Sequence, residues 1–154
     1  MKRVLFVCLG NICRSAMAQG VLEQLSKQNN LNLSVDSAGT SNYHVGEAPD
    51  IRMQKKAKEH NINISTQKAR QFTRDDFHNF DYIFAMDQIN FNTIILMANN
   101  ENERKKISLF LEQSSQINFK NVPDPYYGNE KDFEAVYQIL HSTCIEFINT
   151  LKNE

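Results

Sequence analysis

The chain has 154 residues, 41% of them hydrophobic, which predicts a single domain spanning residues 1–154. The formal net charge is −1, and the densest cationic run, Arg104–Lys106, is too short to indicate a nucleic-acid-binding surface. No stretch approaches the ~18 apolar residues of a membrane-spanning helix. Only four apolar residues separate the basic N-terminus from Cys8, too few for a signal peptide, so we expect no nucleic-acid and no membrane partner.

The cysteine content favours a reducing, cytoplasmic environment. There are three cysteines, Cys8, Cys13 and Cys144, and neither their odd number nor their spacing is typical of disulfides. There is no C-x-x-C motif, and no cysteine–histidine cluster has the spacing of a zinc site. The four histidines are scattered along the chain and are predicted to lie at the surface. We therefore expect a cytoplasmic protein without a metal ion or cofactor.

The N-terminal part of the chain predicts a strand, a tight loop and a helix in succession. Residues 4–7 are apolar and suit a short buried strand. Met17, Val21 and Leu25 recur at helical spacing within a helix expected over 15–28. A loop that leads into a helix in this way points backbone N–H groups inward at the helix N-terminus and creates an anion-binding site.

The remaining elements continue this alternation. Further strands are expected at 33–37, 82–86 and 107–111, and helices at about 51–60, from Thr73, after Asp87 and over 133–151. Thr73 would cap its short helix together with Asp76, three residues further on. Strands that alternate with helices predict an α/β fold: a single-domain three-layer sandwich with a four-stranded parallel sheet and helices on both faces. Ligands of such sheets bind beyond the carboxyl ends of the strands, where Cys8 falls.

The loop itself carries residues suited to phosphate chemistry. A thiol at the end of a strand and beside a helix N-terminus, as expected for Cys8, loses its proton readily because the amides and the helix dipole favour the thiolate. The guanidinium of Arg14 presents a fork of donors that matches two phosphate oxygens. Gly10 and Asn11 are the residue types that adopt left-handed backbone most easily, as a tight loop requires.

The eight residues C-L-G-N-I-C-R-S, 8–15, resemble the phosphate-binding loop of the low molecular weight protein tyrosine phosphatases. The segments V-D-S-A-G-T (35–40), F-D-Y-I with M-D (80–87) and D-P-Y-Y-G (124–128) are similar to further blocks of that family, in the same order. The resemblance therefore covers nearly the whole chain.

This resemblance implies hydrolysis of phosphotyrosine in proteins, or of small aryl phosphates, with inorganic phosphate as the product. Cys8 would attack phosphorus and form a phosphocysteine, while Asp124 would protonate the leaving oxygen and later activate water. Arg14 and the loop amides would hold the phosphate oxygens, and the Ser15 hydroxyl would donate to the thiolate. The phosphate-binding loop is expected to comprise Leu9, Gly10, Asn11, Ile12, Cys13 and Ser15.

Aromatic residues are expected to form the walls of the substrate cleft. Tyr126 and Tyr127 follow Asp124 directly and would pack against the ring of the substrate, with Tyr43 on the opposite lip. An aromatic pair of this kind is also common in ordinary packing, so the residues alone leave both interpretations open.

The support of the loop departs from the usual family pattern. Gln67 stands where eukaryotic relatives often carry a histidine that holds the loop asparagine, and Ala16 stands where proline is common. Glutamine can donate and accept hydrogen bonds but carries no charge. We expect Ser37 to contribute to the support of Asn11.

Three alternatives can be compared on the sequence. Arsenate reductases of this fold need two further cysteines in the middle of the chain, which contains none, since Cys144 is on the last helix. Phosphoarginine phosphatases resemble this loop but have threonine at the position of Ile12, where a small polar residue makes room for a guanidinium. A non-catalytic phosphotyrosine-binding protein would need neither the nucleophile Cys8 nor the acid Asp124.

Cys13 lies in the same loop as Cys8 and suggests redox protection. An ionised Cys8 would be oxidised first by peroxide, to a sulfenic acid. We expect Cys13 to close a disulfide with it before irreversible oxidation; the alternative is that Cys13 only fills space under the loop.

Overall fold

The computed structural model describes residues 1–154. Its centre is a four-stranded sheet in the order β2-β1-β3-β4, with every neighbouring pair parallel. The strands are β1 (Lys2–Cys8), β2 (Leu33–Gly39), β3 (Tyr82–Ala85) and β4 (Ile107–Leu109). Cys8 pairs with Gly39, and Val7 pairs with Ala85, so three strands end at one edge of the sheet. The predicted parallel α/β architecture is confirmed.

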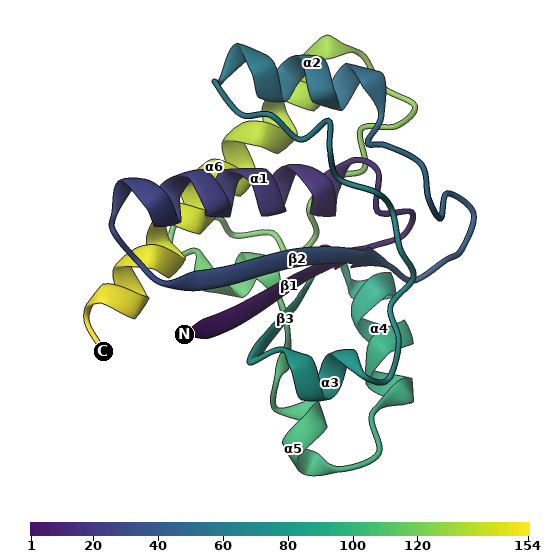
Figure 1. The fold of residues 1–154 in the computed structure, drawn as a ribbon, viewed down its shortest axis with the longest axis vertical. Helices are drawn as coiled ribbons and strands as arrows, with labels where there is room; N and C mark the ends of the chain where they lie inside the picture. Colours follow the sequence, from purple (N-terminus) through teal and green to yellow (C-terminus); the bar gives the residue numbers. More distant parts are fainter.

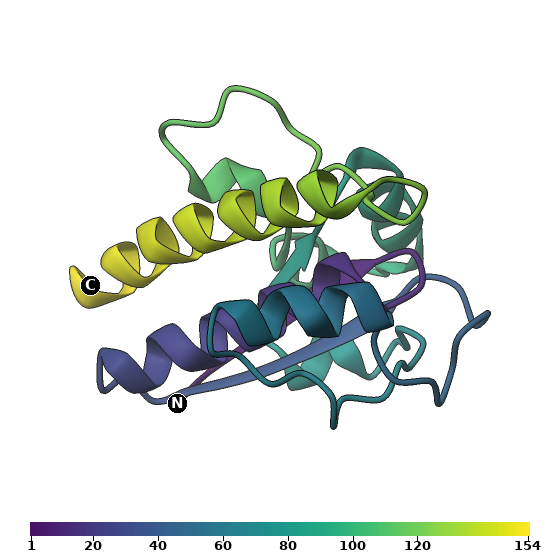
Figure 2. The same cartoon turned by 90° about the horizontal axis from the view of Figure 1, so that it is seen from above.

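Helices cover both faces of this sheet (Figure 1). One face carries α1 (Arg14–Gln28), α2 (Ile51–Glu59) and α6 (Glu130–Lys152), and the other carries α3 (Asp76–Asn79), α4 (Gln88–Met97) and α5 (Glu101–Arg104). Figure 2 shows α6 and α1 running side by side, and Figures 1 and 2 together show that α2 lies over α1 on the side away from the sheet. None of these helices combines the length and the apolar character needed to cross a membrane.

The central strand β1 separates two apolar cores because its side chains alternate between the faces. Val4 and Phe6 point into the larger core, beneath α1 and α6, whereas Leu5 and Val7 point into the smaller one. All four of these side chains are fully buried. This explains why the strand reads as a continuous apolar run, which is typical of a parallel strand covered on both sides.

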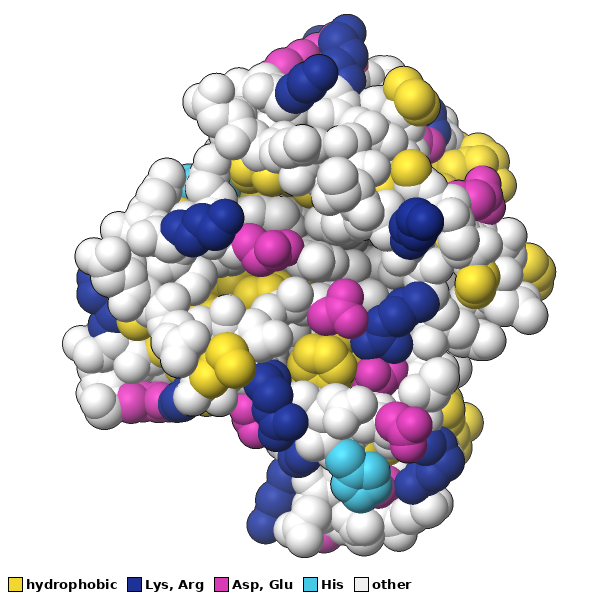
Figure 3. Space-filling view, in the orientation of Figure 1, with side chains coloured by type: hydrophobic (Ala, Val, Ile, Leu, Met, Phe, Trp, Pro, Cys, Tyr) yellow, Lys and Arg dark blue, Asp and Glu magenta, His cyan; other side chains and the backbone are white.

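The surface carries charges of both signs. Basic and acidic side chains are interspersed over the face shown in Figure 3, and no broad area of one sign appears there. This distribution agrees with the formal net charge of −1.

Several element ends lie one to three residues from their expected positions, and three segments differ in kind or extent. The strand expected to reach Leu111 ends at Leu109, because η1, a 3-10 helix over Phe110–Gln113, begins there. The short helix expected from Thr73 begins at Asp76, although Asp76 does accept a hydrogen bond from the Thr73 N–H. Helix α5 was not expected, since four residues are too few to show helical periodicity.

Candidate active site

The loop of residues 9–13 joins the carboxyl end of β1 to the N-terminus of α1 (Figure 1). Asn11 has a left-handed backbone, with φ of 57°. Gly10 does not have a positive φ, so the expectation that both residues are left-handed is wrong for Gly10. A Cβ on Gly10 would instead lie 3.0 Å from a carbon of the His44 ring, and a Cβ on Gly39 would lie 2.7 Å from the Leu9 carbonyl oxygen. Close packing against the backbone accounts for glycine at 39, whereas a Cβ at 10 would require the partly exposed His44 ring to shift slightly.

The Cys8 thiol is 3% exposed and lies inside this loop. The backbone N–H of Asn11 donates to Cys8 Sγ at 3.3 Å, and Ser15 Oγ lies 3.0 Å from the same sulfur. Both contacts stabilise a thiolate, as does the N-terminus of α1, which begins at Arg14. The sulfur is therefore in a setting suited to a nucleophile.

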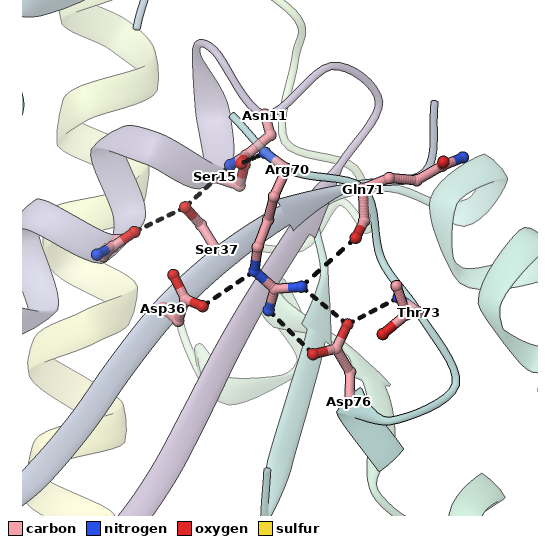
Figure 4. Close-up of polar contacts among 9 residues, drawn as sticks. Asn11, Ser15, Asp36, Ser37, Arg70, Gln71, Thr73 and Asp76 are labelled. Carbon is pink, nitrogen blue, oxygen red and sulfur yellow. Dashed lines mark hydrogen bonds and ion pairs between the residues drawn. The ribbon is translucent and has the colours of Figure 1, made fainter. Parts of the chain in front are cut away.

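The Asn11 side chain connects the loop to two other segments (Figure 4). Its Nδ2 donates to Ser15 Oγ at 2.8 Å and to Ser37 Oγ at 2.9 Å. Its Oδ1 accepts from the backbone N–H of Arg70 at 3.1 Å. Gln67 does not contact Asn11: its Nε2 donates to the Ala16 carbonyl at 3.1 Å. The support of Asn11 that a histidine at position 67 would give is thus made by a main-chain N–H three residues later.

Arg14 is 4% exposed and faces two carboxylates. Its Nη1 donates to Asp87 Oδ2 at 2.6 Å and to the Val122 carbonyl at 3.0 Å. Its Nη2 lies 3.8 Å from Asp124 Oδ2. Asp87 comes shortly after β3, at the edge of the sheet where Cys8 lies, and caps α4. Arg14 is therefore fixed from three sides.

Electrostatics keep this guanidinium charged. Burial alone would lower the pKa of Arg14, but the negative charge of the Cys8 thiolate, the hydrogen bond to Asp87 and the charges of Asp87 and Asp124 raise it above its ordinary value. The buried cation lines the same cavity as Cys8 and Asp124, so it can attract an anion into that cavity.

A cavity of about 280 Å³ opens over the loop. Its lining consists of Cys8, Leu9, Gly10, Ile12, Cys13, Arg14, Ser41, Tyr43, His44, Asp124, Tyr126 and Tyr127. Asn11, Ser15 and Ser37 are not part of this lining and lie behind the loop.

The aromatic residues lie around the mouth of the cavity. Tyr126 and Tyr127 pack edge to face with ring centroids 5.0 Å apart. Tyr43 and Tyr127 are 79% and 95% exposed, so they stand at the rim, whereas Tyr126 is partly buried. Asp124 has a half-exposed carboxylate, and its Oδ1 accepts from the Tyr126 N–H at 3.1 Å. The structure therefore brings the predicted acid and the predicted walls to the same opening as Cys8.

Cys13 is 5% exposed and is a free thiol, like Cys8. Burial raises its pKa above the ordinary value, and the negative charges of Asp50, Cys8 and Asp124 raise it further. The two cysteines of the loop thus lie in different electrostatic settings: hydrogen-bond donors contact Cys8, whereas burial and nearby negative charges raise the pKa of Cys13.

Sequence reasoning missed two contributors to this site. Asp87 was expected only to precede a helix and to belong to a family-like block, although its position after a buried strand at the carboxyl edge of the sheet is a signal for a site residue. Arg70 contacts Asn11 through its main chain, and no side-chain pattern reports such a contact.

A family model described as low molecular weight phosphotyrosine protein phosphatase matches residues 3–154. The low molecular weight phosphotyrosine protein phosphatases of Rattus norvegicus and Homo sapiens are each 45% identical to this chain over 150 residues, covering 96% of this chain and 94% of each relative. A solved protein tyrosine phosphatase from Entamoeba histolytica superposes with a TM-score of 0.93 at 39% identity, covering 99% of this chain and 98% of that chain. A Drosophila arginine phosphatase superposes with a TM-score of 0.91 at 35% identity, with the same coverage. The chain therefore belongs to the low molecular weight phosphotyrosine protein phosphatase family.

Proposed function

We propose that this protein hydrolyses phosphotyrosine in proteins, and small aryl phosphates, through a phosphocysteine formed on Cys8. The observation that carries the proposal is the convergence of Cys8, Arg14 and Asp124 on one cavity. Membership of a phosphatase family supports it independently.

In the first half-reaction the Cys8 thiolate attacks phosphorus, forming a P–S bond as the P–O bond to the phenol breaks. The backbone amides of the loop and the Arg14 fork hold the three phosphate oxygens and stabilise the charge of the transition state. Asp124, at the mouth of the same cavity, gives its proton to the leaving oxygen, so that tyrosine departs as a neutral phenol.

In the second half-reaction a water molecule attacks phosphorus on the phosphocysteine. The Asp124 carboxylate accepts a proton from this water, and the P–S bond breaks. The products are inorganic phosphate and the Cys8 thiolate, with Asp124 again protonated for the next turnover. One carboxyl group serves both steps because each occurs on the open side of the loop.

The cavity lining favours an aromatic substrate. Ile12, Tyr126 and Tyr127 all line the cavity, so an apolar side chain and two aromatic rings face a bound substrate. Flat rings stack well against such surfaces, whereas a phosphoarginine guanidinium carries donors that Ile12 cannot satisfy. The structural similarity to the Drosophila arginine phosphatase makes phosphoarginine the main alternative substrate.

The test is the turnover of phosphotyrosine, phosphoserine and phosphoarginine peptides of otherwise identical sequence. We expect the wild type to act on the phosphotyrosine peptide and Cys8→Ser to lose nearly all turnover. Cys144→Ala is the matched control, since this free thiol lies on α6 and does not line the cavity. A preference for phosphoarginine, or an active Cys8→Ser, would overturn the proposal.

We also propose that residues 1–154 act as one catalytic domain on phosphoproteins in the cytoplasm. The free thiols of Cys8, Cys13 and Cys144 support a reducing compartment, because a nucleophilic thiolate must remain reduced to work.

A further inference from the structure

The backbone N–H of Arg70 sets the direction of a hydrogen-bond chain that ends at Cys8. A backbone amide can only donate, so the Asn11 atom that it contacts at 3.1 Å must be the carbonyl oxygen Oδ1. The Nδ2 group of Asn11 consequently faces Ser15 and Ser37, and its two hydrogens go to their hydroxyl oxygens. The orientation of this amide is therefore fixed from outside the loop.

The orientation of Asn11 determines which hydrogen bonds the two serine hydroxyls can donate. Ser15 Oγ already accepts from Asn11, so its own hydrogen is free for Cys8 Sγ at 3.0 Å. Ser37 Oγ likewise accepts from Asn11 and donates to Gln19 Oε1 at 2.7 Å. If Asn11 were flipped, its oxygen would compete with the sulfur for the Ser15 hydrogen, and the thiolate would lose a donor.

The main chain of Arg70 is held at the end of β2. The Gly39 N–H donates to the Arg70 carbonyl at 2.8 Å, and the Phe72 N–H donates to the Gly39 carbonyl at 2.7 Å. These bonds attach residues 70–72 to the strand beside Cys8, but they do not involve the N–H of Arg70.

The side chain of Arg70 is held by two carboxylates from different elements (Figure 4). Its Nε donates to Asp36 Oδ2 on β2 at 3.1 Å. Its Nη1 and Nη2 donate to the two oxygens of Asp76 on α3 at 3.1 and 2.9 Å. Asp76 is 3% exposed and also accepts from the Thr73 N–H, whereas Asp36 is half-exposed. The guanidinium is thus clamped across the edge of the sheet.

We propose that Asp76 and Asp36 are positioning residues of the phosphatase reaction, acting through Arg70 and Asn11 on the Cys8 thiolate. The inference rests on the proposed role of Cys8 as nucleophile. Neither carboxylate lines the cavity, so neither touches the substrate. Each carboxylate holds Arg70, whose backbone N–H orients the side-chain amide of Asn11. With the amide in this orientation, the Ser15 hydroxyl hydrogen is free to be donated to Cys8 Sγ.

Neutralising Asp76 should loosen this arrangement without removing a group from the site. Asp76→Asn leaves a charged, partly buried guanidinium with a poorer partner, which weakens one of the most directional contacts in proteins. The Arg70 segment then moves, its N–H no longer fixes Asn11, and Ser15 donates to Cys8 for only part of the time.

The experiment measures alkylation of Cys8 by iodoacetate as a function of pH, with mass mapping of the modified cysteine. We expect Asp76→Asn to move the midpoint of this profile to higher pH. We also expect it to lower kcat for a phosphotyrosine peptide about tenfold, the effect of losing one hydrogen bond to a charged group. Asp36→Asn, at a half-exposed position with a single bond, should move the midpoint in the same direction by less and remain folded.

Glu103→Gln is the matched control. Glu103 is also buried and also meets an arginine with both carboxylate oxygens, although here the single nitrogen Nη2 of Arg74 donates to both, at 3.1 and 3.2 Å. It also accepts a backbone N–H, from Asn99 at 2.8 Å. Glu103 has no contact with the hydrogen bonds that link Arg70, Asn11 and Ser15 to Cys8. Glu103→Gln should therefore destabilise the fold comparably and leave the midpoint of Cys8 alkylation unchanged.

The path is tested in a Ser15→Ala background, where the donor to Cys8 is already absent. If Asp76 acts through this donor, Asp76→Asn should add no further shift there. A full additional shift, or an unchanged midpoint in both Asp76→Asn and Asp36→Asn, would overturn the inference. Failure of the proposed function is distinguishable, because it would appear in the wild type as turnover that survives alkylation of Cys8.

Discussion

Arg14 lines the cavity and forms a hydrogen-bonded ion pair with Asp87 at 2.6 Å. Asp87 is itself anchored, since its second oxygen accepts from the Asn90 N–H at 2.8 Å and caps α4. Side-chain exposure is 4% for Arg14 and 18% for Asp87, so the pair is little screened by water. The guanidinium proposed to bind phosphate is thus oriented by a carboxylate that is fixed at a helix N-terminus.

The first prediction is that Asp87→Asn lowers kcat/KM for phosphotyrosine peptides by about tenfold, because it removes the charge that orients Arg14. Asparagine still caps α4, so the thermal stability should change little. Asp87→Ala should add a loss of about 1 kcal/mol in unfolding free energy, since the cap is then absent as well. Steady-state kinetics and thermal unfolding separate the two roles, and an unchanged kcat/KM in Asp87→Asn would show that Arg14 does not need this partner.

The second prediction concerns Asp124 as the proton donor. Asp124→Asn should slow hydrolysis of phosphotyrosine by about a hundredfold, because its phenolate leaves poorly without a proton. An aryl phosphate with an acidic phenol, such as p-nitrophenyl phosphate, should be slowed much less in phosphocysteine formation, measured as the burst phase. Equal slowing of both substrates would mean that Asp124 only positions the loop.

The parts of the site that follow one another in the chain were predictable from the sequence. Cys8 and Arg14 lie in one strand–loop–helix unit, so apolar periodicity and helix-terminus chemistry are enough to place them. Asp124 enters the site from a distant loop, and only the family resemblance, now confirmed, connected it with Cys8.

Contacts in which one carboxylate binds both a nearby backbone N–H and a distant arginine were not predictable. A helix was expected after Asp87, and Asp87 does cap it, but its other oxygen binds Arg14. Asp76 was expected to bond Thr73 and does, while the same carboxylate also clamps Arg70. A sequence pattern shows the local partner of a carboxylate, whereas the distant partner depends on how the strands are ordered.

The third prediction is a pH dependence of stability at the contact between α2 and α6. Glu134 lies 3.2 Å from Lys56 Nζ and 3.0 Å from His60 Nε2. Burial would raise the pKa of Glu134, but hydrogen bonds from Gln138, His60 and Lys56 lower it to about 2. Since an unfolded glutamate has a pKa of about 4.3, this pairing stabilises the fold above about pH 5 and is lost as the pH falls toward 2.

Glu134→Gln should therefore show a shallower fall of Tm between about pH 5 and 2 than the wild type. Glu130→Gln is the control: Glu130 is 71% exposed and lies 3.5 Å from Lys56, so its profile should follow the wild type. Parallel profiles for Glu134→Gln and the wild type would mean that the pairing contributes nothing to stability.

The last prediction concerns the reversible oxidation of Cys8. Peroxide converts the Cys8 thiolate to a sulfenic acid, and the Cys13 thiolate then attacks this sulfur, forming a disulfide and releasing hydroxide. Both cysteines line the same cavity. Burial and the negative charge of Asp50 keep the pKa of Cys13 above its ordinary value, so only a small fraction of Cys13 is ionised at neutral pH. Closure should therefore be slow at pH 7 and accelerate as the pH rises.

Asp50→Asn tests the electrostatic part of this prediction. It removes the negative charge beside Cys13 while its side-chain oxygen still accepts from the Arg52 N–H and caps α2, so closure at a fixed pH should become faster. The measurement is the ratio of dimedone-trapped sulfenic acid to the Cys8–Cys13 disulfide over time, by mass mapping at several pH values. Cys13→Ser should give sulfenic acid without disulfide and recover less activity when a reductant is added. A rate of disulfide formation that is independent of pH and unchanged in Asp50→Asn would mean that ionisation of Cys13 does not control the reaction. Equal recovery of activity in Cys13→Ser and the wild type would show that Cys13 does not protect Cys8.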